Sequence, residues 1–322
     1  MSTTIWQKEL LQSTRSIQEL TQHLGIDLPF RIHDHFPIKV TPLYLSLITK
    51  KNPYDPLLLQ VISPQVNAQH ELHFTESPLS EKDFTPIPGL IHKYENRLLL
   101  LLTSQCMIHC QYCFRQHFPY LENQINPQNL EKILAYIQER PNINEIIFSG
   151  GDPLLAKNNY IERVLSRLSQ IKHISTIRIH SRVISILPKR IDKQLSDILK
   201  SCSKKIVIVN HINHPNELCA QNIETFQELA ENHTLLNQSV LLNHVNNDPE
   251  VLAKLSQKLF SARIIPYYLH LLDPVIGAEF YALPNQDALR IYQKLQAILP
   301  GYLVPKLVRE IPGKKNKTLI ST

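Results

Sequence analysis

An α/β fold with a parallel sheet is the architecture that this 322-residue sequence predicts. Apolar runs of strand length alternate with helical segments between residues 97 and 273, which is typical of a parallel sheet with helices outside it. Polar residues follow each apolar run, where the active sites of such folds lie. Six predicted strands are too few for a closed eight-stranded barrel. A doubly wound sheet and a partial (β/α)6 barrel of the TIM type are therefore the two candidates.

The N-terminal part of the chain lacks this alternation. Residues 5–24 have polar positions interleaved at helical spacing, which predicts an amphipathic helical segment, and several prolines then interrupt the chain. A proline-rich loop that ends at Gly89 marks a boundary near residue 90. The predicted organisation is a helical or irregular N-terminal region at 1–92, an α/β core at 93–300 and a short C-terminal segment at 301–322.

The alternation begins with RLLLLLTS, a continuous apolar run typical of a strand that is buried on both faces. Each later unit pairs a segment of helical periodicity with a short apolar run that ends in polar residues. The predicted strands are 97–104, 144–152, 176–182, 204–215, 235–245 and 263–273, and the predicted helices are 126–140, 158–171, 190–202, 216–232 and 248–262.

Composition and charge exclude several classes of protein. With 43% hydrophobic and 19% charged residues, the body of the chain is expected to be globular rather than disordered. The net charge of +6 is spread along the chain without a basic block, so we expect no nucleic-acid partner. The N-terminus lacks the layout of a signal peptide and no apolar run reaches membrane-spanning length, so we expect no membrane partner. Five cysteines, three of them clustered, indicate a reducing cytoplasm.

The three clustered cysteines, Cys106, Cys110 and Cys113, have the spacing C-x3-C-x2-C. A structural zinc site usually has four ligands in two pairs; His109 or His117 could supply a fourth ligand, but there is no second pair. A redox pair at Cys110 and Cys113 would leave Cys106 without a role. Three thiolates suit a 4Fe-4S cluster with one open iron, and this spacing is the signature of radical S-adenosylmethionine (SAM) enzymes. We favour the cluster over the two alternatives.

A glycine pair follows the second predicted strand, in SGGDPL. Two glycines let the backbone approach a ligand closely, and a tight turn is the simpler alternative. The chain has only seven glycines, so a pair at a strand end favours the ligand. Gly150, Gly151 and Asp152 resemble the element by which radical SAM enzymes hold the methionine part of SAM.

Over most of its length the sequence resembles the lysine 2,3-aminomutase family, and within it the branch that makes (R)-β-lysine for the modification of elongation factor P. The resemblance is carried by TPLYLSLI, PGLIHKYENRLLLLLTSQC, CQYCFR, SGGDPL, RIHSR, VNHINHPNEL, NQSVLL, PYYLHLLD and LVPKLVREIPGKKNK. It implies the partial barrel of radical SAM enzymes. It also implies that a 4Fe-4S cluster and S-adenosylmethionine generate a radical, while pyridoxal phosphate lets the amino group of lysine move from C2 to C3.

The resemblance also implies a role for individual residues. Arg115 matches the arginine that pairs with the substrate carboxylate, for which a guanidinium fork is suited. A lysine in HKYENR replaces one arginine of the family, which keeps the charge but loses the fork. The implied cluster ligands are Cys106, Cys110 and Cys113, the implied pyridoxal phosphate site is Lys93, Tyr94 and Arg97, and the implied SAM site is Gly150, Gly151, Asp152, Arg182, His211 and Gln238.

Three residues near the C-terminus complete the implied site. Asp273 matches a carboxylate that pairs with the ε-ammonium group of the substrate, and Glu310 stands where free-lysine mutases have the second such carboxylate, an aspartate. Glu310 lies seven residues before Lys317, which is the family's interval between this carboxylate and the lysine that binds pyridoxal phosphate. The interval selects Lys317 over Lys314 and Lys315. A shift of register to Lys315 is the alternative, because the tail has fewer glycines than the family.

Two departures from the family bear on the branch and on one loop. Longer members carry further C-terminal cysteines and an oligomerising extension, and their absence from this sequence favours the branch that serves the translation factor. Asn243 and His244 stand where relatives usually have an arginine and a glycine, which leaves the role of that loop open.

The expected function is conversion of L-α-lysine to (R)-β-lysine. The expected indirect partners are a β-lysine ligase and elongation factor P, with an external electron donor such as flavodoxin. One alternative is a mutase for free lysine or another amino acid. Another is a metal-cluster module that contacts RNA or a translation factor without catalysis. A homo-oligomer is compatible with the sequence.

Overall fold

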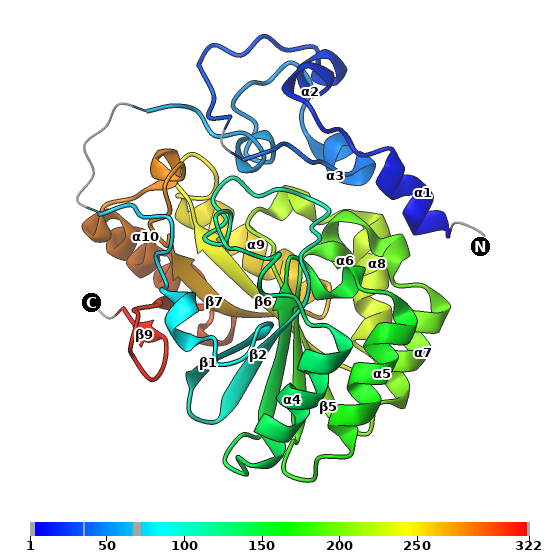
Figure 1. Cartoon of the computed structure of the whole chain (residues 1–322). Helices are drawn as coiled ribbons and strands as arrows, with labels where there is room; N and C mark the ends of the chain where they lie inside the picture. Colours follow the sequence, from blue (N-terminus) through cyan, green and yellow to red (C-terminus); the bar gives the residue numbers. More distant parts are fainter. Residues whose placement is uncertain (1–3, 35, 67–71, 321–322) are drawn as a thin grey trace.

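The computed structural model describes residues 4–34, 36–66 and 72–320. A nine-stranded sheet forms its centre, and each strand is hydrogen-bonded to its neighbours in chain order (Figure 1). Strands β2 to β8 run parallel, whereas β1 and β9 lie antiparallel at the two edges. The strands span Leu90–Tyr94 (β1), Arg97–Thr103 (β2), Glu145–Gly150 (β3), Thr176–Ser181 (β4), Lys205–Asn210 (β5), Thr234–Leu241 (β6), Ile265–Leu271 (β7), Lys306–Arg309 (β8) and Thr318–Leu319 (β9).

The strand order distinguishes between the two candidate folds. A doubly wound sheet reverses its order at a switch point, whereas a barrel adds each new strand to the same edge. Here every parallel strand lies beside the preceding one, and no pairing joins β9 to β1 within the described residues. The sheet therefore winds as an open partial barrel, which confirms the predicted α/β class and the partial barrel.

Helices cover the outer face of the sheet between successive strands (Figure 1). Side-chain caps fix several of their starts: Asn126 accepts a hydrogen bond from the backbone of Asn129 at α4, and Asp192 does so from Leu195 at α7. No helix in the described part of the chain is long and apolar enough to cross a bilayer. The helices are α4 (Pro127–Gln138), α5 (Asn158–Ser169), α6 (Val183–Ile186), α7 (Lys193–Ser201), α8 (Ala220–Leu229), α9 (Pro249–Ser261) and α10 (Asn285–Ile298).

The six strands and five helices predicted between residues 97 and 273 are all present, but the sheet is larger than predicted. β8 adds a seventh parallel strand and β1 and β9 add the two edges. β8 has only four residues, KLVR, of which Leu307 and Val308 are buried. So short a run has no recognisable period, and its place in the sheet depends on pairing with β7.

The N-terminal region contains three short helices, α1 (Ile5–Leu11), α2 (Ile17–Leu24) and α3 (Pro42–Leu47). The helical segment predicted at 5–24 is therefore two helices. The chain turns between them, where Thr14 pairs with Val40 through the backbone and Ser16 caps α2 by accepting a hydrogen bond from Glu19. Local pairing of this kind overrides helical periodicity.

The same region lies across the carboxyl ends of the strands and belongs to the core (Figure 1). Leu24 and Tyr44 are buried in the same hydrophobic cluster as Leu98 and Ile146 of the sheet. The predicted division between residues 92 and 93 falls inside β1, and β8 and β9 return to the sheet after residue 300. The N-terminal region thus shares one hydrophobic cluster with the sheet, while Leu303 and Leu307 of the C-terminal segment pack in a second cluster with Leu269 and Leu271 of β7.

Candidate active site

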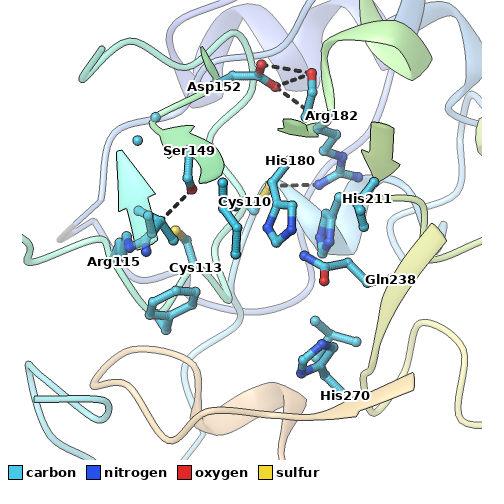
Figure 2. Close-up of a pocket in the computed structure, with 18 of the residues that line it drawn as sticks. Cys110, Cys113, Arg115, Ser149, Asp152, His180, Arg182, His211, Gln238 and His270 are labelled. Carbon is cyan, nitrogen blue, oxygen red and sulfur yellow. Dashed lines mark hydrogen bonds between the residues drawn. The ribbon is translucent and has the colours of Figure 1, made fainter. Parts of the chain in front are cut away.

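A cavity of about 680 Å³ fills the interior of the partial barrel (Figure 2). It extends from the loops at the carboxyl ends of the strands to residues at their starts, such as Glu145 and Arg178, so it is deeper than the strand-end site that the sequence suggests. All sixteen candidate residues line it: Lys93, Tyr94, Arg97, Cys106, Cys110, Cys113, Arg115, Gly150, Gly151, Asp152, Arg182, His211, Gln238, Asp273, Glu310 and Lys317.

The three cysteines of the C-x3-C-x2-C motif lie on the loop after β2 as free thiols. Burial raises the pKa of Cys106 well above its ordinary value, and the charge of a Cys113 thiolate would raise it further. Burial and the charge of Cys110 raise the pKa of Cys113 to about 12. The thiolates therefore repel one another, and a cationic group is needed to hold them ionised together. An iron–sulfur cluster is such a group.

His109, one of the two histidines considered as a fourth zinc ligand, contacts other groups. Nδ1 of His109 lies 2.7 Å from the carbonyl oxygen of Pro37, and its ring stacks on Phe36 with centroids 4.9 Å apart. In the described ranges, no three histidine, cysteine, aspartate or glutamate side chains are grouped so as to hold one metal ion. In a 4Fe-4S cluster each thiolate binds a different iron, so its ligands need not converge on one point. The cysteine loop fits the cluster better than mononuclear zinc.

The glycine pair after β3 packs against the backbone that leads into the cysteine loop. A Cβ on Gly150 would overlap the carbonyl oxygen of Thr103, and one on Gly151 would overlap that of Gln105. The amides of Gly151 and Asp152 instead donate hydrogen bonds to these two carbonyls, each at 2.7 Å. The glycines thus allow a close approach to the protein's own backbone, which fixes the base of the cysteine loop.

Asp152 links the ends of β3 and β4. Its carboxylate accepts hydrogen bonds from Ser181 Oγ at 2.8 Å and from the backbone amides of Arg182 at 2.7 Å and Val183 at 3.0 Å (Figure 2). Burial raises the pKa of Asp152, and these hydrogen bonds oppose that rise. The carboxylate holds two strand ends in register beside the cavity.

Arg182 connects the cysteine loop to a buried polar network. Its Nη1 donates to Cys110 Sγ at 2.7 Å and to Tyr112 Oη at 2.8 Å. Its Nη2 donates to Gln60 Oε1 at 2.8 Å and to Glu217 Oε2 at 2.9 Å. Burial raises the pKa of Glu217, but the charge of Arg182 and several hydrogen bonds more than offset this and lower it. Because removing one partner would leave a buried charge, the pair fixes this side of the loop.

His211 follows β5 and is a neutral imidazole. Burial and the charge of Arg182 lower its pKa to about 3. Its Nε2 lies 2.9 Å from Tyr112 Oη, and the ring also hydrogen-bonds to the backbone of Gln238. The Gln238 side chain lies beside it in the cavity (Figure 2). Neutral hydrogen-bonding groups of this kind suit an uncharged part of a ligand better than a phosphate.

Charged groups dominate another part of the wall, where Glu310 lies between two lysines. Its Oε1 accepts a hydrogen bond from Lys93 Nζ at 2.5 Å and its Oε2 from Lys317 Nζ at 2.9 Å. Burial raises the pKa of Glu310, but the two ammonium groups lower it far below its usual range. Lys317 lines the cavity, whereas Lys314 and Lys315 are exposed. The Lys93–Glu310 pair also spans the open side of the barrel, since it joins β1 to the segment after β8.

The β1–β2 hairpin places Tyr94 and Arg97 beside Lys93. Tyr94 and Arg97 are a cross-strand pair, and the guanidinium of Arg97 lies 4.2 Å from the centre of the Tyr94 ring. Burial and the charge of Glu310 raise the pKa of Tyr94, so its hydroxyl stays protonated. The hairpin thus presents two cations and a phenol to the cavity.

The same charges act on Asp273, two residues after β7, but its pKa shifts in the opposite direction to that of Glu310. Burial raises the pKa of its carboxyl to about 7, and the negative charge of Glu310 contributes to this rise. Lys317 and Lys93 lower it only in part. Asp273 is therefore a carboxyl group that an incoming cation would ionise.

Glu81, which no sequence pattern indicated, is the residue that binds Arg115 most closely. Glu81 Oε2 and Oε1 accept hydrogen bonds from Arg115 Nε at 2.7 Å and Nη2 at 2.8 Å, and Ser149 Oγ accepts one from Nη1 at 2.9 Å. Glu81 belongs to a polar loop of the N-terminal region, and nothing in the loop's sequence marks it as part of a site.

Two further imidazoles line the cavity, His180 on β4 and His270 on β7 (Figure 2). The Nε2 atom of each is buried and has no hydrogen-bond partner among the described residues. Burial lowers the pKa of both well below its ordinary value, so both rings are neutral. The sequence placed these histidines at strand ends but gave them no role. Buried groups without partners are sites where a ligand or water completes the hydrogen bonds.

Comparisons with known proteins are in keeping with this geometry. Residues 100–255 match the model of the Radical SAM superfamily. An L-lysine 2,3-aminomutase of Haemophilus influenzae is 45% identical over 285 residues, which cover 88% of this chain and 84% of that protein. The L-lysine 2,3-aminomutase of Escherichia coli is 42% identical over 324 residues, which cover 97% and 93%.

The chain belongs to the lysine 2,3-aminomutase family of radical SAM enzymes. A third member, from Buchnera aphidicola, is 40% identical over 98% of this chain and 95% of its own length. Members of the family are isomerases, and membership of the radical SAM superfamily implies a 4Fe-4S cluster and S-adenosylmethionine. The cysteine loop fits that cluster in donor type and charge. Five charged residues of the cavity lie outside the segment that matches the superfamily model: Glu81, Lys93, Asp273, Glu310 and Lys317.

Proposed function

We propose that the protein is a pyridoxal phosphate-dependent aminomutase that converts L-α-lysine into (R)-β-lysine. The observation that carries this proposal is that a cysteine loop and a lysine–carboxylate group line the same cavity. The similar proteins from H. influenzae and E. coli bear the name L-lysine 2,3-aminomutase. When bound, the cluster and S-adenosylmethionine supply a radical, and pyridoxal phosphate supplies the carbonyl carbon that carries the migrating nitrogen.

Lys317 and the β1–β2 hairpin are the proposed site for pyridoxal phosphate. Lys93 and Arg97 offer two cations to a phosphate group, and Tyr94 offers a hydroxyl donor. Glu310 holds the amine of Lys317 at 2.9 Å and so fixes its position in the cavity. An amine at a defined point beside a phosphate-binding wall is what the attachment of this cofactor requires.

The substrate is proposed to lie between Arg115 and Asp273. Arg115 would bind the α-carboxylate through a charge-assisted hydrogen bond, and Asp273 would bind the ε-ammonium group. Glu310 would provide a second carboxylate near the same ammonium group. The neutral groups His211 and Gln238, together with Gly150 and Gly151, would bind S-adenosylmethionine beside the cluster.

The branch that serves elongation factor P is the proposed biological setting. The presence of Glu310 instead of an aspartate supports this branch over the free-lysine mutases. The product would pass to a β-lysine ligase, and an external donor such as flavodoxin would reduce the cluster in the cytoplasm. These partners are proposals that rest on the resemblance of the sequence.

Reconstitution under anaerobic conditions tests the activity directly. The purified chain is loaded with iron, sulfide and pyridoxal phosphate, reduced, and incubated with S-adenosylmethionine and with lysine, glutamate or alanine in separate reactions. Formation of β-lysine from lysine, with its (R) configuration read by chiral chromatography, is the expected result. A product from glutamate or alanine would indicate a different mutase, and a reconstituted protein that forms no β-lysine would contradict the proposal.

The non-catalytic alternative is tested by the colour of the purified protein. A brown chromophore together with a yellow one that borohydride traps on Lys317 is the expected result. A colourless, zinc-loaded protein that binds RNA would instead support the binding module. Sedimentation of the same sample measures whether the chain forms a homo-oligomer.

A further inference from the structure

Arg115, the proposed partner of the substrate carboxylate, is already engaged by another carboxylate. Glu81 contacts it through two parallel hydrogen bonds of 2.7 and 2.8 Å, the fork geometry that gives such pairs both strength and direction. Both side chains are more than nine-tenths buried, at 9% exposure for Arg115 and 7% for Glu81. An ion pair at this depth is protected from solvent and from salt, so it constrains the guanidinium group.

The hydrogen bonds leave a defined part of Arg115 free. A guanidinium group has five N–H donors, one on Nε and two on each Nη atom. Glu81 occupies Nε and one donor of Nη2, and Ser149 occupies one donor of Nη1. One donor on each Nη atom therefore has no protein partner among the described residues. Since Arg115 lines the cavity, these two donors are available to a carboxylate there.

The backbone before Glu81 has an unusual conformation. Ser80 has φ 48° and ψ 39°, a left-handed conformation that is unfavourable for a non-glycine residue. The short 3-10 helix Glu81–Phe84 begins directly after it. At the end of this helix Thr85 Oγ1 donates a hydrogen bond of 2.8 Å to the carbonyl oxygen of Glu81. This turn directs the Glu81 side chain into the protein, although its neighbours Lys82 and Asp83 are exposed.

We propose that Glu81 is a positioning residue that orients Arg115 toward the α-carboxylate of the substrate. This inference rests on the proposed function. Glu81 also balances the charge of Arg115, so a simple anion gains little from the net charge at this point. Recognition then depends on the direction of the two free N–H donors, which favours a substrate whose carboxylate is held at the right place by its other contacts.

The test compares the binding of lysine and lysinamide, in which a neutral amide replaces the carboxylate. Binding is measured by calorimetry on the anaerobic holoenzyme, loaded with cluster and pyridoxal phosphate but without reductant, so that no turnover is needed. We expect the wild-type protein to prefer lysine. Glu81→Gln keeps the shape of the side chain but removes its charge, and it should reduce that preference about tenfold or more, because one acceptor of the fork becomes a donor. Glu81→Asp should retain an intermediate preference.

Glu131→Gln is the matched control. Glu131 also forms a two-point pair, with Nη1 and Nη2 of Arg167 at 2.6 Å each, but on the surface and away from the cavity. Its change should leave the preference for lysine unaltered. Thermal melting of each variant shows whether it is folded. If Glu81→Gln is not folded, the preference of Glu81→Asp is compared with that of the wild type instead.

Two outcomes would overturn the inference: a wild-type protein without any preference for lysine over lysinamide, or a Glu81→Gln protein whose preference equals or exceeds that of the wild type, since a gain would mean that charge and not direction governs recognition. The outcome for the proposed function is separate, because it is decided by whether reduced wild-type enzyme forms β-lysine. Steady-state kinetics adds a second reading if β-lysine is formed. The loss in Glu81→Gln should then be larger for kcat/KM with lysine than with lysinamide.

Discussion

Asp273 and Glu310 lie on the same wall of the cavity, yet their surroundings give them opposite acidities. Two lysine ammonium groups lower the pKa of Glu310, whereas burial and the charge of Glu310 raise that of Asp273 to about 7. Pairs of carboxyl groups separated in this way usually have different roles. Glu310 is a permanent anion that holds two lysines, and Asp273 is the group whose charge changes when a cation enters.

The raised pKa of Asp273 predicts a pH dependence of stability. The folded protein binds more protons at this group than the unfolded chain between about pH 4 and pH 7, so the free energy of unfolding should fall as pH rises through this range. Asp273→Asn lacks this dependence. Urea unfolding should show that the wild type and Asp273→Asn are equally stable near pH 4. Above pH 7 the variant should be more stable by roughly 2 kcal/mol, a figure reduced to allow for water in the cavity. A constant difference across the range would contradict the assignment.

The role of Lys317 in β-lysine formation should be separable from the binding of the cluster. Lys317→Ala removes the proposed attachment point of pyridoxal phosphate but leaves Glu310 paired with Lys93. We expect iron content and the brown colour to be retained and β-lysine formation to fall by at least about a hundredfold. Lys315→Ala is the control, because Lys315 is exposed and should be dispensable. Activity that survives in Lys317→Ala and is lost in Lys315→Ala would show that the register is wrong.

At this scale the residues that could be predicted are those that occur in motifs. Cys106, Cys110 and Cys113 are close in sequence, so their spacing alone indicates that they act together. Glu81 lies 34 residues before Arg115, and a glutamate in a polar loop looks like any solvated charge. Only the fold brings the two together. The same holds for the pKa of Asp273, which depends on charges from β1 and from the segment after β8.

The element that determines the position of the cysteine loop is the turn after β3. Two hydrogen bonds of 2.7 Å join this turn to the backbone after β2, and the absence of Cβ atoms at Gly150 and Gly151 allows them to form. The sequence indicated a close approach at this point but suggested a ligand as the partner. The backbone of the neighbouring loop is a partner that no local pattern reveals.

Gly151→Ala tests this role of the turn. Its added methyl group would overlap the carbonyl of Gln105, so the base of the cysteine loop must shift, and we expect a loss of about 1–3 kcal/mol in stability. Iron bound after reconstitution should fall as well. Gly301→Ala is the control, since no atom lies within 4 Å of a Cβ at that position. Equal iron content in the two variants would show that the turn does not position the loop.

Element prediction succeeded where periodicity extends over many residues and failed where it does not. The helices α4, α5 and α9 each show apolar residues at regular spacing over at least twelve residues, and all three were predicted. β8 and β9 have four and two residues, and they lie in the sheet because β8 pairs with β7 and β9 pairs with β8. Edge strands of this length depend on tertiary pairing and leave no local signal.

The N-terminal region and the barrel form one folding unit rather than two. Hydrogen bonds join the two parts. Lys39 Nζ donates to the carbonyl oxygen of Cys106 at 2.5 Å, and the backbone amide of Gln111 donates to the carbonyl oxygen of Gln60. Thr41 Oγ1 donates to the carbonyl oxygen of Ile186. These contacts and the shared core mean that neither part buries its apolar surface alone. The whole chain should therefore unfold cooperatively.

The single tryptophan makes this testable. Trp6 lies on α1, where the guanidinium of Arg190 is 4.8 Å from its ring, so its fluorescence reports on the N-terminal region. Circular dichroism reports on all helices. The urea midpoints from the two signals should coincide, and in Thr41→Ala both should shift together by about 1–2 kcal/mol in stability. An earlier midpoint for Trp6 fluorescence would show that the region unfolds independently.

Lys93, Asp273, Glu310 and Lys317 come from outside the segment that matches the superfamily model, while the cysteine loop, the glycine turn and Arg115 come from within it. Exchanging the two flanks with those of another family member should therefore replace the groups proposed to hold pyridoxal phosphate and the ε-ammonium group, and leave the cysteine loop and Arg115 in place. Protein engineers who wish to redirect the reaction therefore have a natural pair of crossover points, one before residue 100 and one after residue 255.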